Sequence, residues 1–329
     1  MDQTVLITGA SGLLGANLVR YMYALGYTIR VLVRPGADLS VLADIPMDIR
    51  YGYIDRKASV EDAIQGCRYV VHAASLTTQW GMAYEAYQTI NITATQYIAE
   101  ACMAYGVDRM IYIGTANTLA PGSKSAPGTE LNAFGLHHIN SGYINSKYVA
   151  LQYIQEQVQQ KGLPAVIISP TFMIGAYDIK PSSGQLILHG LSRSWMAYPS
   201  GGKNFVHVTD VCKGIVQALD RGGIGEHYLL AGHNLTYKEF FRTVDAASGM
   251  VRRKLRIPGA LLRGLGRAGS LLEQVMRRPV KLNYAGAYML SLDNYYSGAK
   301  AARELDIQYQ DIDTAVADAL QWFRQQRYC

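Results

Sequence analysis

The opening of the chain constrains its fold more than any other feature, because an apolar run passes directly into a glycine-rich turn and then into a helical pattern. The run Val5–Thr8 ends at Gly9, and the glycines follow the spacing G-x-x-G-x-x-G. Gly9 permits a sharp turn, Gly12 permits close approach to a pyrophosphate, and Gly15 lets the helix pack on the sheet. This predicts a dinucleotide site at the helix N-terminus, with a purely structural turn as the alternative. The expected contacts are Gly9, Ser11, Gly12, Leu13, Leu14 and Gly15.

Up to about residue 169, short β-branched runs alternate with longer helical stretches. The runs are apolar throughout, which indicates strands buried on both faces of a parallel sheet covered by helices. The sequence therefore predicts an α/β fold with a Rossmann-type, doubly wound parallel sheet. Strands are expected at Val5–Thr8, Ile29–Val33, Ile49–Tyr53, Tyr69–His72, Met110–Ile113 and Ala165–Ile168, and helices at Leu13–Leu25, Tyr84–Tyr105 and Tyr143–Gln160.

After Pro170 the regular alternation weakens, and turns and short helices become more frequent. We therefore expect a dinucleotide-binding domain over 1–170, to which 205–221 returns. A smaller, mostly C-terminal substrate-binding region would comprise 171–204 and 222–329. Within these later segments the pattern predicts a strand at Phe205–Val208 and a helix at Ile312–Gln325.

The cysteine and histidine patterns bear on compartment and metal binding. Four cysteines in 329 residues are too scattered for a CxxC pair and too few to cross-link a chain of this length. The first residues contain no long apolar h-region, and no window approaches the roughly 18 apolar residues that a spanning helix needs. These features predict a cytoplasmic protein. The seven histidines form no ligand cluster, so we expect no metal site.

The end of the second strand bears on which cofactor the site takes. An acid there bonds the ribose 2′-hydroxyl of NAD, whereas an arginine accommodates the 2′-phosphate of NADP. Here the strand Thr28–Val33 is followed by Arg34, and no acid occurs before Asp38. The sequence therefore favours NADP(H), with NAD(H) possible. The alternative is that Arg34 is simply a solvated charge at the end of the strand.

A Tyr-x-x-x-Lys pair on a helix places both side chains on one face, where the ammonium lowers the phenol pKa toward neutrality. This chain, with 24 tyrosines, has three such pairs, so the motif alone decides little. One pair begins at Tyr53, which would end the third strand, and another at Tyr296, far into the C-terminal region. Tyr143 opens a strong helical pattern before the sixth strand, which singles out Tyr143 and Lys147.

The opening Thr8-Gly9-Ala10-Ser11-Gly12-Leu13-Leu14-Gly15 resembles the extended branch of the short-chain dehydrogenase/reductase superfamily, the NAD-dependent epimerase/dehydratase family. Within it the chain is most similar to the dihydroflavonol reductase-like proteins. The resemblance covers almost the whole chain. Further matching stretches are Val71-His72-Ala73-Ala74, Asn91 and its neighbours, Ser169-Pro170-Thr171, and Val206-His207-Val208-Thr209-Asp210.

The resemblance implies roles for three residues. Thr115 takes the place of the family's serine after the fifth strand, whereas Gly114 departs from the pattern. Tyr143 would exchange a proton with the substrate oxygen, and Thr115 would hydrogen-bond the same oxygen. Lys147 would bond the nicotinamide ribose and lower the Tyr143 pKa, while the cofactor carries the hydride. The alternative is that the three residues only cap and pack.

Further contacts follow from the resemblance or from the place of residues after the strands. Tyr53 and Ile54 stand where the family has an acid at the adenine. Trp80 follows the fourth strand, and Asn91 either bonds backbone across helices or relays a proton. His138 borders the substrate or lies in a solvated loop. The further cofactor contacts are Tyr53, Ile54, Ala73, Ala74, Tyr143, Lys147, Pro170 and Met173, and the weaker substrate contacts are Trp80 and His138.

These residues together predict an NADP(H)-dependent oxidoreductase that transfers a hydride between nicotinamide and a carbonyl or alcohol of a small-molecule substrate. One alternative is a nucleotide-sugar epimerase or dehydratase that holds its NAD(P) tightly. Another is a non-catalytic NADP-sensing or scaffold protein. The resemblance also implies a homodimer formed through the predicted helices Tyr84–Tyr105 and Tyr143–Gln160.

The net charge of +6 resides in one segment. Residues 252–281 hold nine basic residues and one acid, which gives +8 there and leaves −2 for the rest of the chain. Their apolar residues recur at helical spacing, so the segment could lie on an anionic membrane surface. We favour the alternative that its apolar face packs on the substrate region and its outer face is solvated. Without interleaved stacking aromatics, nucleic acid is not an expected partner.

Overall fold

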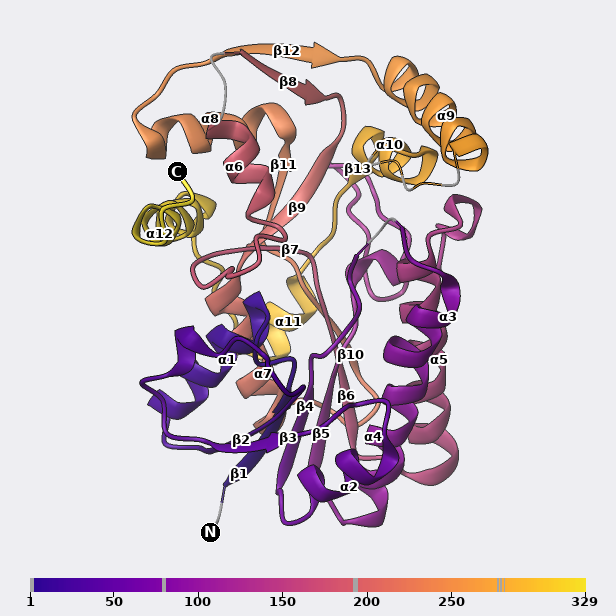
Figure 1. Cartoon of the computed structure of the whole chain (residues 1–329), viewed down its shortest axis with the longest axis vertical. Coiled ribbons are helices and arrows are strands. Elements are labelled where there is room, and N and C mark those ends of the chain that lie inside the picture. The colour runs from indigo at the N-terminus through magenta and orange to yellow at the C-terminus, as the bar shows by residue number, and fades with distance from the viewer. Residues whose placement is uncertain (1–2, 79–80, 192–194, 277, 279, 281) are drawn as a thin grey trace.

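The computed structural model describes residues 3–78, 81–191, 195–276, 278, 280 and 282–329. Within these residues one parallel sheet of seven strands has the order β10-β6-β5-β4-β1-β2-β3 (Figure 1). The predicted doubly wound α/β fold is confirmed. The strands are β1 (Thr4–Thr8), β2 (Thr28–Val33), β3 (Asp48–Tyr51), β4 (Tyr69–His72), β5 (Arg109–Ile113), β6 (Ala165–Pro170) and β10 (His227–Leu230).

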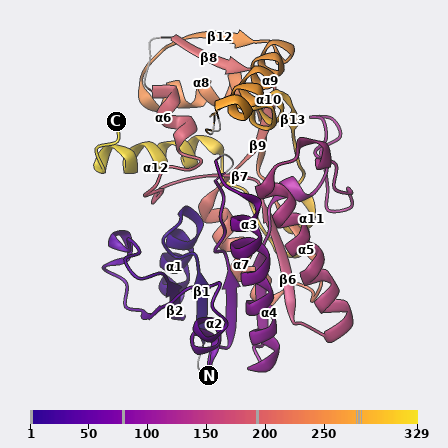
Figure 2. The same cartoon turned by 45° about the vertical axis from the view of Figure 1, so that its right-hand side comes forward.

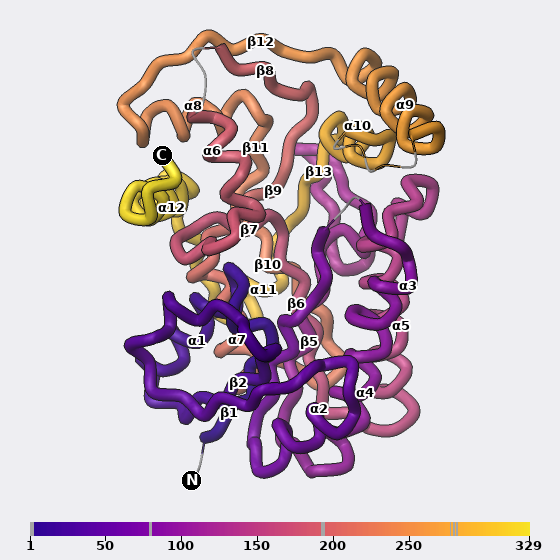
Figure 3. The backbone as a smooth tube through the Cα atoms, viewed as in Figure 1, coloured from indigo at the N-terminus to yellow at the C-terminus, as the bar shows by residue number. Residues whose placement is uncertain are grey.

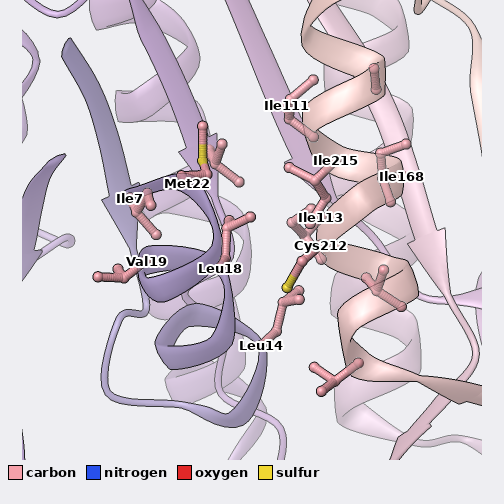
Figure 4. Packing of buried hydrophobic residues seen from close by; sticks show 14 of the residues in the cluster. Ile7, Leu14, Leu18, Val19, Met22, Ile111, Ile113, Ile168, Cys212 and Ile215 are labelled. Atoms are coloured by element: carbon pink, nitrogen blue, oxygen red, sulfur yellow. The ribbon is translucent and has the colours of Figure 1, made fainter. Parts of the chain in front are cut away.

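Helices cover both faces of this sheet, which explains why its central strands bury apolar residues on both sides. In β1, Val5 and Ile7 point into one core cluster and Leu6 into the other. Figure 4 shows the first cluster, where Leu18 of α1 faces Ile215 of α7. Figure 2 shows the helices that cover the other face of the sheet. The first layer is α1 (Leu13–Ala24) and α7 (Val208–Asp220), and the opposite layer is α2 (Lys57–Ile64), α4 (Ala94–Ala104) and α5 (Gly142–Lys161).

The strand order reverses between β1 and β4, which lie side by side although α1, β2, β3 and α2 separate them in the chain. In open α/β sheets, ligands bind at such a switch point, outside the carboxyl ends of the strands. At this edge the residues that follow β1, β2, β4 and β5 lie together. They include Gly9, Arg34, Ala73 and Thr115.

The second region lies beyond that edge and packs around its own core, in which Phe205 stacks on Phe240 with ring centroids 4.2 Å apart. Figure 3 shows the chain passing more than once between the sheet and this region. Its strands are β7 (Phe172–Ile174), β8 (Trp195–Pro199), β9 (Gly202–His207), β11 (His233–Thr236), β12 (Arg253–Ile257) and β13 (Asp293–Asn294). Its helices are α6 (Gln185–Leu191), α8 (Tyr237–Ser248), α9 (Gly259–Met276), α10 (Tyr284–Ser291) and α12 (Ile312–Gln325), and α11 (Ala299–Glu304) packs by β10.

Several predicted bounds change. The third strand ends at Tyr51, so Tyr53 is not part of it. Val208 opens α7 rather than closing a strand, because the His207 ring caps the helix by accepting the Thr209 N–H. The helix expected over Tyr84–Tyr105 is divided into α3 (Tyr84–Tyr87), a π-helical turn (Gln88–Thr93) and α4.

The expected boundary at residue 222 placed the last sheet strand in the substrate region. Instead β10 pairs in parallel with β6, with His227 opposite Ile167, and therefore belongs to the large sheet. Of the segment 205–221, expected to return to the dinucleotide-binding domain, α7 packs on the large sheet, whereas β9 pairs with β7, β11 and β13 in the second region.

The basic segment also differs from its prediction. It begins as strand β12 before becoming helix α9, and most apolar residues of α9 face outward instead of packing on the substrate region. Leu262 is buried, but Leu261, Leu265 and Leu272 are each about half exposed or more. Among the helices that the structure describes, none is long and apolar enough to cross a membrane.

Candidate active site

In the glycine turn after β1, protein packing requires a glycine at two positions but not at the third. Gly9 has φ of +80°, and a Cβ there would lie 2.8 Å from the Ala74 nitrogen. A Cβ on Gly15 would lie 2.0 Å from the Gly9 carbonyl oxygen, so packing excludes a side chain. A Cβ on Gly12 would make only an ordinary contact of 3.4 Å, and Gly12 is exposed. Protein packing therefore requires Gly9 and Gly15, and it leaves space open in front of Gly12.

The first turn of α1 is built to face an anion. Gly12 is its N-cap and supplies no side-chain cap, so the N–H groups of Leu13 and Leu14 have no intrahelical partner. The turn contains no acidic residue that would repel a phosphate. Ser11 is half-buried beside them. The unoccupied space at Gly12 and the free N–H groups of the first helical turn fit the pyrophosphate of a dinucleotide.

Arg34 lies directly after β2 and is exposed. The first acid beyond it, Asp38, accepts the backbone N–H of Ser40 at 3.0 Å, so its carboxylate is engaged in its own turn. Tyr53, two residues beyond β3, has an exposed fraction of 48%. Ile54 instead packs against the core cluster beneath α2 and α4. A guanidinium and a phenol therefore border the expected adenosine side of the site, and the first acid after Arg34 is engaged in its own turn.

A hydrogen-bonded chain starts at the loop that contains Ala73 and Ala74. The Ala74 N–H donates to Thr8 Oγ1 at 3.1 Å, and Thr8 Oγ1 lies 2.9 Å from His72 Nδ1. His72 Nε2 lies 3.0 Å from Thr95 Oγ1, whose own proton goes to the Asn91 carbonyl at 2.7 Å. His72 Nε2 therefore donates, and Nδ1 accepts from Thr8. Burial, and after it the Lys147 charge, lowers the pKa of His72 to about 3, so the ring is neutral.

The same chain continues to the catalytic helix. The Asn91 side chain accepts the Leu76 N–H at 2.8 Å and donates to Ser146 Oγ at 2.9 Å. Ser146 Oγ in turn donates to the Tyr143 carbonyl at 2.8 Å. Asn91 lies in the π-helical turn, a feature frequent at functional sites. Its side chain bonds the backbone of the loop after β4, in agreement with the structural role weighed for it.

The three predicted catalytic residues meet at the carboxyl end of β5. Thr115 follows that strand, and its hydroxyl lies beside the phenol of Tyr143, where a hydrogen bond to the phenolate would lower the pKa of Tyr143. Ser141 caps α5, so Tyr143 sits in the first turn and Lys147 one turn later on the same side. The Lys147 Nζ donates to the Ile113 carbonyl at 2.6 Å and lies 4.6 Å from the centroid of the Tyr112 ring.

The electrostatics differ from the sequence expectation in one respect. Burial raises the pKa of Tyr143, and the hydrogen bond with Thr115 opposes this only in part. Burial also lowers the pKa of Lys147 to about 7. The expected lowering of the Tyr143 pKa by Lys147 is therefore not found. The physical reason is that desolvation penalises both charged forms, the phenolate and the ammonium, more than their surroundings compensate.

Gly114, the departure from the family pattern, has a structural explanation. A Cβ at this position would lie 2.6 Å from Ser169 Oγ on β6. The Ser169 hydroxyl is itself held by His227 Nε2 of β10 at 2.8 Å. A larger residue at position 114 would displace this pair. The sequence showed no link between residues 114, 169 and 227, because the link depends on the pairing of β5, β6 and β10.

The remaining predicted residues lie at different depths. Trp80 falls outside the described residues. His138 is exposed and meets the Tyr288 ring of α10 edge-on at 4.9 Å. Pro170 is buried at the end of β6, and Met173 packs against the core beneath α1 and α7. A cavity of about 430 Å³ borders the start of α5, with lining residues that include Met82, Tyr84, Asn140, Ser141, Asn145 and Glu273.

Sequence reasoning missed Thr8, Thr95 and Ser146 as supports of the site. Each is a small hydroxyl residue that is buried within a strand or helix. The one available signal was His72, a polar residue at the end of a fully buried strand, because such a group must find partners. The identity of those partners depends on how β1, β4 and the π-helical turn pack together.

Comparisons with known proteins agree with this fold. The profile of the NAD dependent epimerase/dehydratase family matches residues 5–231. A protein of Synechocystis sp. named for dihydroflavonol 4-reductase is 28% identical, covering 100% of this chain and 96% of its own. Sterol demethylase protein B of Methylococcus capsulatus is 28% identical, covering 98% of both chains. The crystal structure of gox2253 superposes with a TM-score of 0.88 at 30% identity, covering 99% of both chains.

The parallel sheet, the glycine turn at its switch point and the Thr115, Tyr143 and Lys147 cluster define a dinucleotide-dependent enzyme of the extended short-chain dehydrogenase type. The chain belongs to the NAD dependent epimerase/dehydratase family. The resemblance read from its motifs is thereby confirmed, including its similarity to proteins named for dihydroflavonol reductase.

Proposed function

We propose that this protein is an NADP(H)-dependent oxidoreductase that transfers a hydride between nicotinamide and a carbonyl or alcohol substrate. The observation that carries the proposal is the contact between Thr115 and Tyr143 one helical turn from a buried Lys147. The relative named for dihydroflavonol 4-reductase supports the carbonyl or alcohol class.

In this mechanism the nicotinamide, when bound, supplies the hydride to the carbonyl carbon. The Tyr143 phenol then donates its proton to the carbonyl oxygen, and the Thr115 hydroxyl bonds the same oxygen and orients it. The raised pKa keeps Tyr143 protonated near neutral pH, which suits proton donation and hence reduction. Lys147 would hold the ribose, and it is poised to return a proton because its own pKa is about 7.

The test is Tyr143→Phe, which keeps the ring and removes the proton. Turnover should fall at least about a hundredfold, the usual size of a general-acid contribution, while cofactor binding stays close to wild type. Tyr153→Phe, further along α5, is the matched control and should retain turnover. If Tyr143→Phe leaves turnover within a few-fold of wild type, the mechanism is wrong.

We further propose that the site prefers NADP(H) through Arg34. The exposed guanidinium and the engagement of Asp38 with Ser40 support this preference, since a 2′-phosphate needs a cation and no facing carboxylate. Arg34→Ala should raise the KM for NADPH about tenfold or more and leave the KM for NADH nearly unchanged. An unchanged KM for NADPH would sink the proposal.

An epimerase or dehydratase would use the same tyrosine but return the hydride to its substrate and retain the cofactor. Purified protein distinguishes the two, because a reductase releases and exchanges NADPH whereas an epimerase keeps NAD bound through gel filtration. A panel of carbonyls and nucleotide sugars, followed at the nicotinamide absorbance, then identifies the substrate class. Turnover of any of them excludes a purely sensing or scaffolding role.

We also propose a cytoplasmic homodimer formed through α3, α4 and α5. Cys67, Cys102 and Cys212 are free and buried, which supports a reducing compartment. Val149 on the outer side of α5 is 40% exposed, and Tyr84 at the start of α3 is 42% exposed, so both are available to a partner. Light scattering should give about twice the chain mass of 36.2 kDa, and Val149→Asp should restore the mass of one chain.

A further inference from the structure

Helix α9 presents an unpartnered apolar face. It packs on the molecule through small residues: a Cβ on Gly266 would lie 2.4 Å from Ala287 Cβ of α10, and one on Gly269 would lie 2.1 Å from the Leu282 carbonyl oxygen. These glycines point inward, and the leucines therefore point outward. The outward apolar residues, 49–81% exposed, are Leu261, Leu265, Leu271, Leu272, Val275 and Met276.

This face is a continuous stripe. Leu261, Leu265, Leu272 and Val275 follow steps of four, seven and three residues, which places them on one side of a helix. The inward glycines occupy the other side. An amphipathic helix normally buries its apolar stripe, yet the described residues provide no partner for this one.

The neighbouring strands extend the apolar surface. Figures 1 and 2 both place β8, β12 and α9 at the end of the molecule farthest from the N-terminus. Trp195 of β8 and Leu255 of β12 are each 59% exposed. The Arg253 guanidinium lies 5.5 Å from the Trp195 ring centroid, directly opposite it in the strand register. Tryptophan, arginine and leucine side by side are typical of a surface that lies at the membrane–water interface.

The charge around the stripe is positive and unneutralised. Arg263 bonds the Ser291 hydroxyl, and Arg267 lies over the Tyr284 ring. Among the ion pairs that the described residues form, none involves Arg253, Arg256, Arg263, Arg267 or Arg278. By contrast, Arg252 and Lys254 both pair with Asp245. The apolar stripe is thus bordered by arginines that form no ion pair among the described residues.

We propose that α9, with the exposed edge of β8 and β12, docks the protein on an anionic lipid surface. Apolar side chains would enter the headgroup boundary while the arginines contact lipid phosphates. A second copy of the chain fits less well, since a two-fold contact would set the same arginines against one another. Because Glu273 of α9 lines the cavity beside Ser141 and Asn145, docking also brings that cavity close to the lipid.

Co-sedimentation of the full chain with vesicles tests this. We expect binding to vesicles of phosphatidylcholine with phosphatidylglycerol, little binding to phosphatidylcholine alone, and release by salt. The double variant Leu265→Glu/Leu272→Glu should lose binding at least about tenfold, and Arg263→Gln/Arg267→Gln about tenfold. Leu131→Glu is the matched control, since Leu131 is 95% exposed in a loop outside this surface, and it should bind like wild type.

Thermal melting shows whether each variant folds, and turnover of a water-soluble carbonyl should be unchanged in the leucine variant, so that loss of docking is separate from loss of catalysis. No sedimentation of folded wild type with anionic vesicles overturns the proposal. So does full binding by the folded leucine variant. A wild-type dimer that the leucine variant converts to monomer, without vesicle binding by either, assigns the face to a second copy instead.

Discussion

At the scale of single residues, Lys147 shows a conflict between stability and chemistry. Its ammonium is buried, with the Ile113 carbonyl as acceptor and the Tyr112 ring beside it. Burial lowers its pKa from the usual 10.5 to about 7, so the folded state resists the charge that the unfolded chain carries freely. This conflict is typical of catalytic groups, because an apolar residue at the same buried position would make the folded protein more stable.

Lys147→Met should therefore stabilise the fold while it removes activity. Between pH 7 and 10.5 the unfolded chain binds more protons at this site than the folded one, so wild-type stability rises with pH across that window. Below about pH 7 the buried ammonium is charged in the folded state, and its full destabilising effect is present. Thermal melts should place the variant about 5 °C above wild type near pH 6, with the gap closing toward pH 10. Lys161→Met, exposed at the end of α5, should show no such pH dependence; an unstabilised Lys147→Met at pH 6 contradicts the argument.

Sequence reasoning predicts the candidate catalytic residues but not their surroundings. Tyr143 and Lys147 are recognisable because helical spacing is local, and Thr115 because it follows a strand whose apolar run is local. The pKa of Tyr143 was predicted in the wrong direction, because burial depends on what α5 packs against. Likewise, only the pairing of β5 with β6 reveals that Ser169 occupies the space beside Gly114.

At the scale of elements, the turn between β1 and α1 combines two kinds of glycine. Gly15 is required because its neighbour is the backbone of Gly9, which cannot move aside. Gly12 is free of such contacts and faces the position where the helix N–H groups point. The same residue type therefore serves packing at one position and ligand approach at the other.

This difference gives a paired prediction. Gly15→Ala should lower the melting temperature by several degrees, because a Cβ 2.0 Å from the Gly9 oxygen forces the turn apart. Gly12→Ala should melt close to wild type, yet bind NADPH at least about tenfold more weakly because the Cβ obstructs the pyrophosphate. Calorimetric titration and melts of both proteins check this. Equal cofactor affinity in Gly12→Ala and wild type would contradict the assignment.

Elements with strong local signals matched the structure closely, and those set by long-range packing did not. The helix Ile312–Gln325 has the predicted bounds because its periodicity is unambiguous and Asp311 stands at its N-cap. The strand His227–Leu230 was not predicted, and the segment that contains it was placed in the substrate region, since nothing local distinguishes a strand that joins β6. The outward face of α9 was the less favoured of two interpretations, because periodicity predicts a helix, but not what that helix contacts.

At the scale of the whole molecule, two buried histidines make the fold sensitive to acid. Burial, and after it the charge of a nearby lysine, lowers the pKa of His72 to about 3 and that of His227 to about 4. Both rings are neutral and hydrogen-bonded in the fold. When the chain unfolds they take up protons below their usual pKa of 6.5, so each favours unfolding as the pH drops.

Stability should therefore fall as the pH decreases from about 6.5 to 4, by about 3 kcal/mol for each histidine. In His227→Gln the amide can still reach the Ser169 hydroxyl but cannot be protonated, so its stability should change less over this interval. Urea unfolding at a series of pH values measures both slopes. Parallel slopes for the variant and wild type would show that His227 does not contribute.

The several crossings between the sheet and the second region have a mechanical consequence. The strand β6 ends at Pro170 and β7 begins at Phe172, while β9 ends at His207 and α7 begins at Val208. A third strap runs from β10 at Leu230 to β11 at His233. Several short connections between the sheet and the second region together resist the rotation that a single hinge would permit. We therefore expect molecules to reach the site through movements of loops and side chains, while the sheet and the second region keep a fixed spacing.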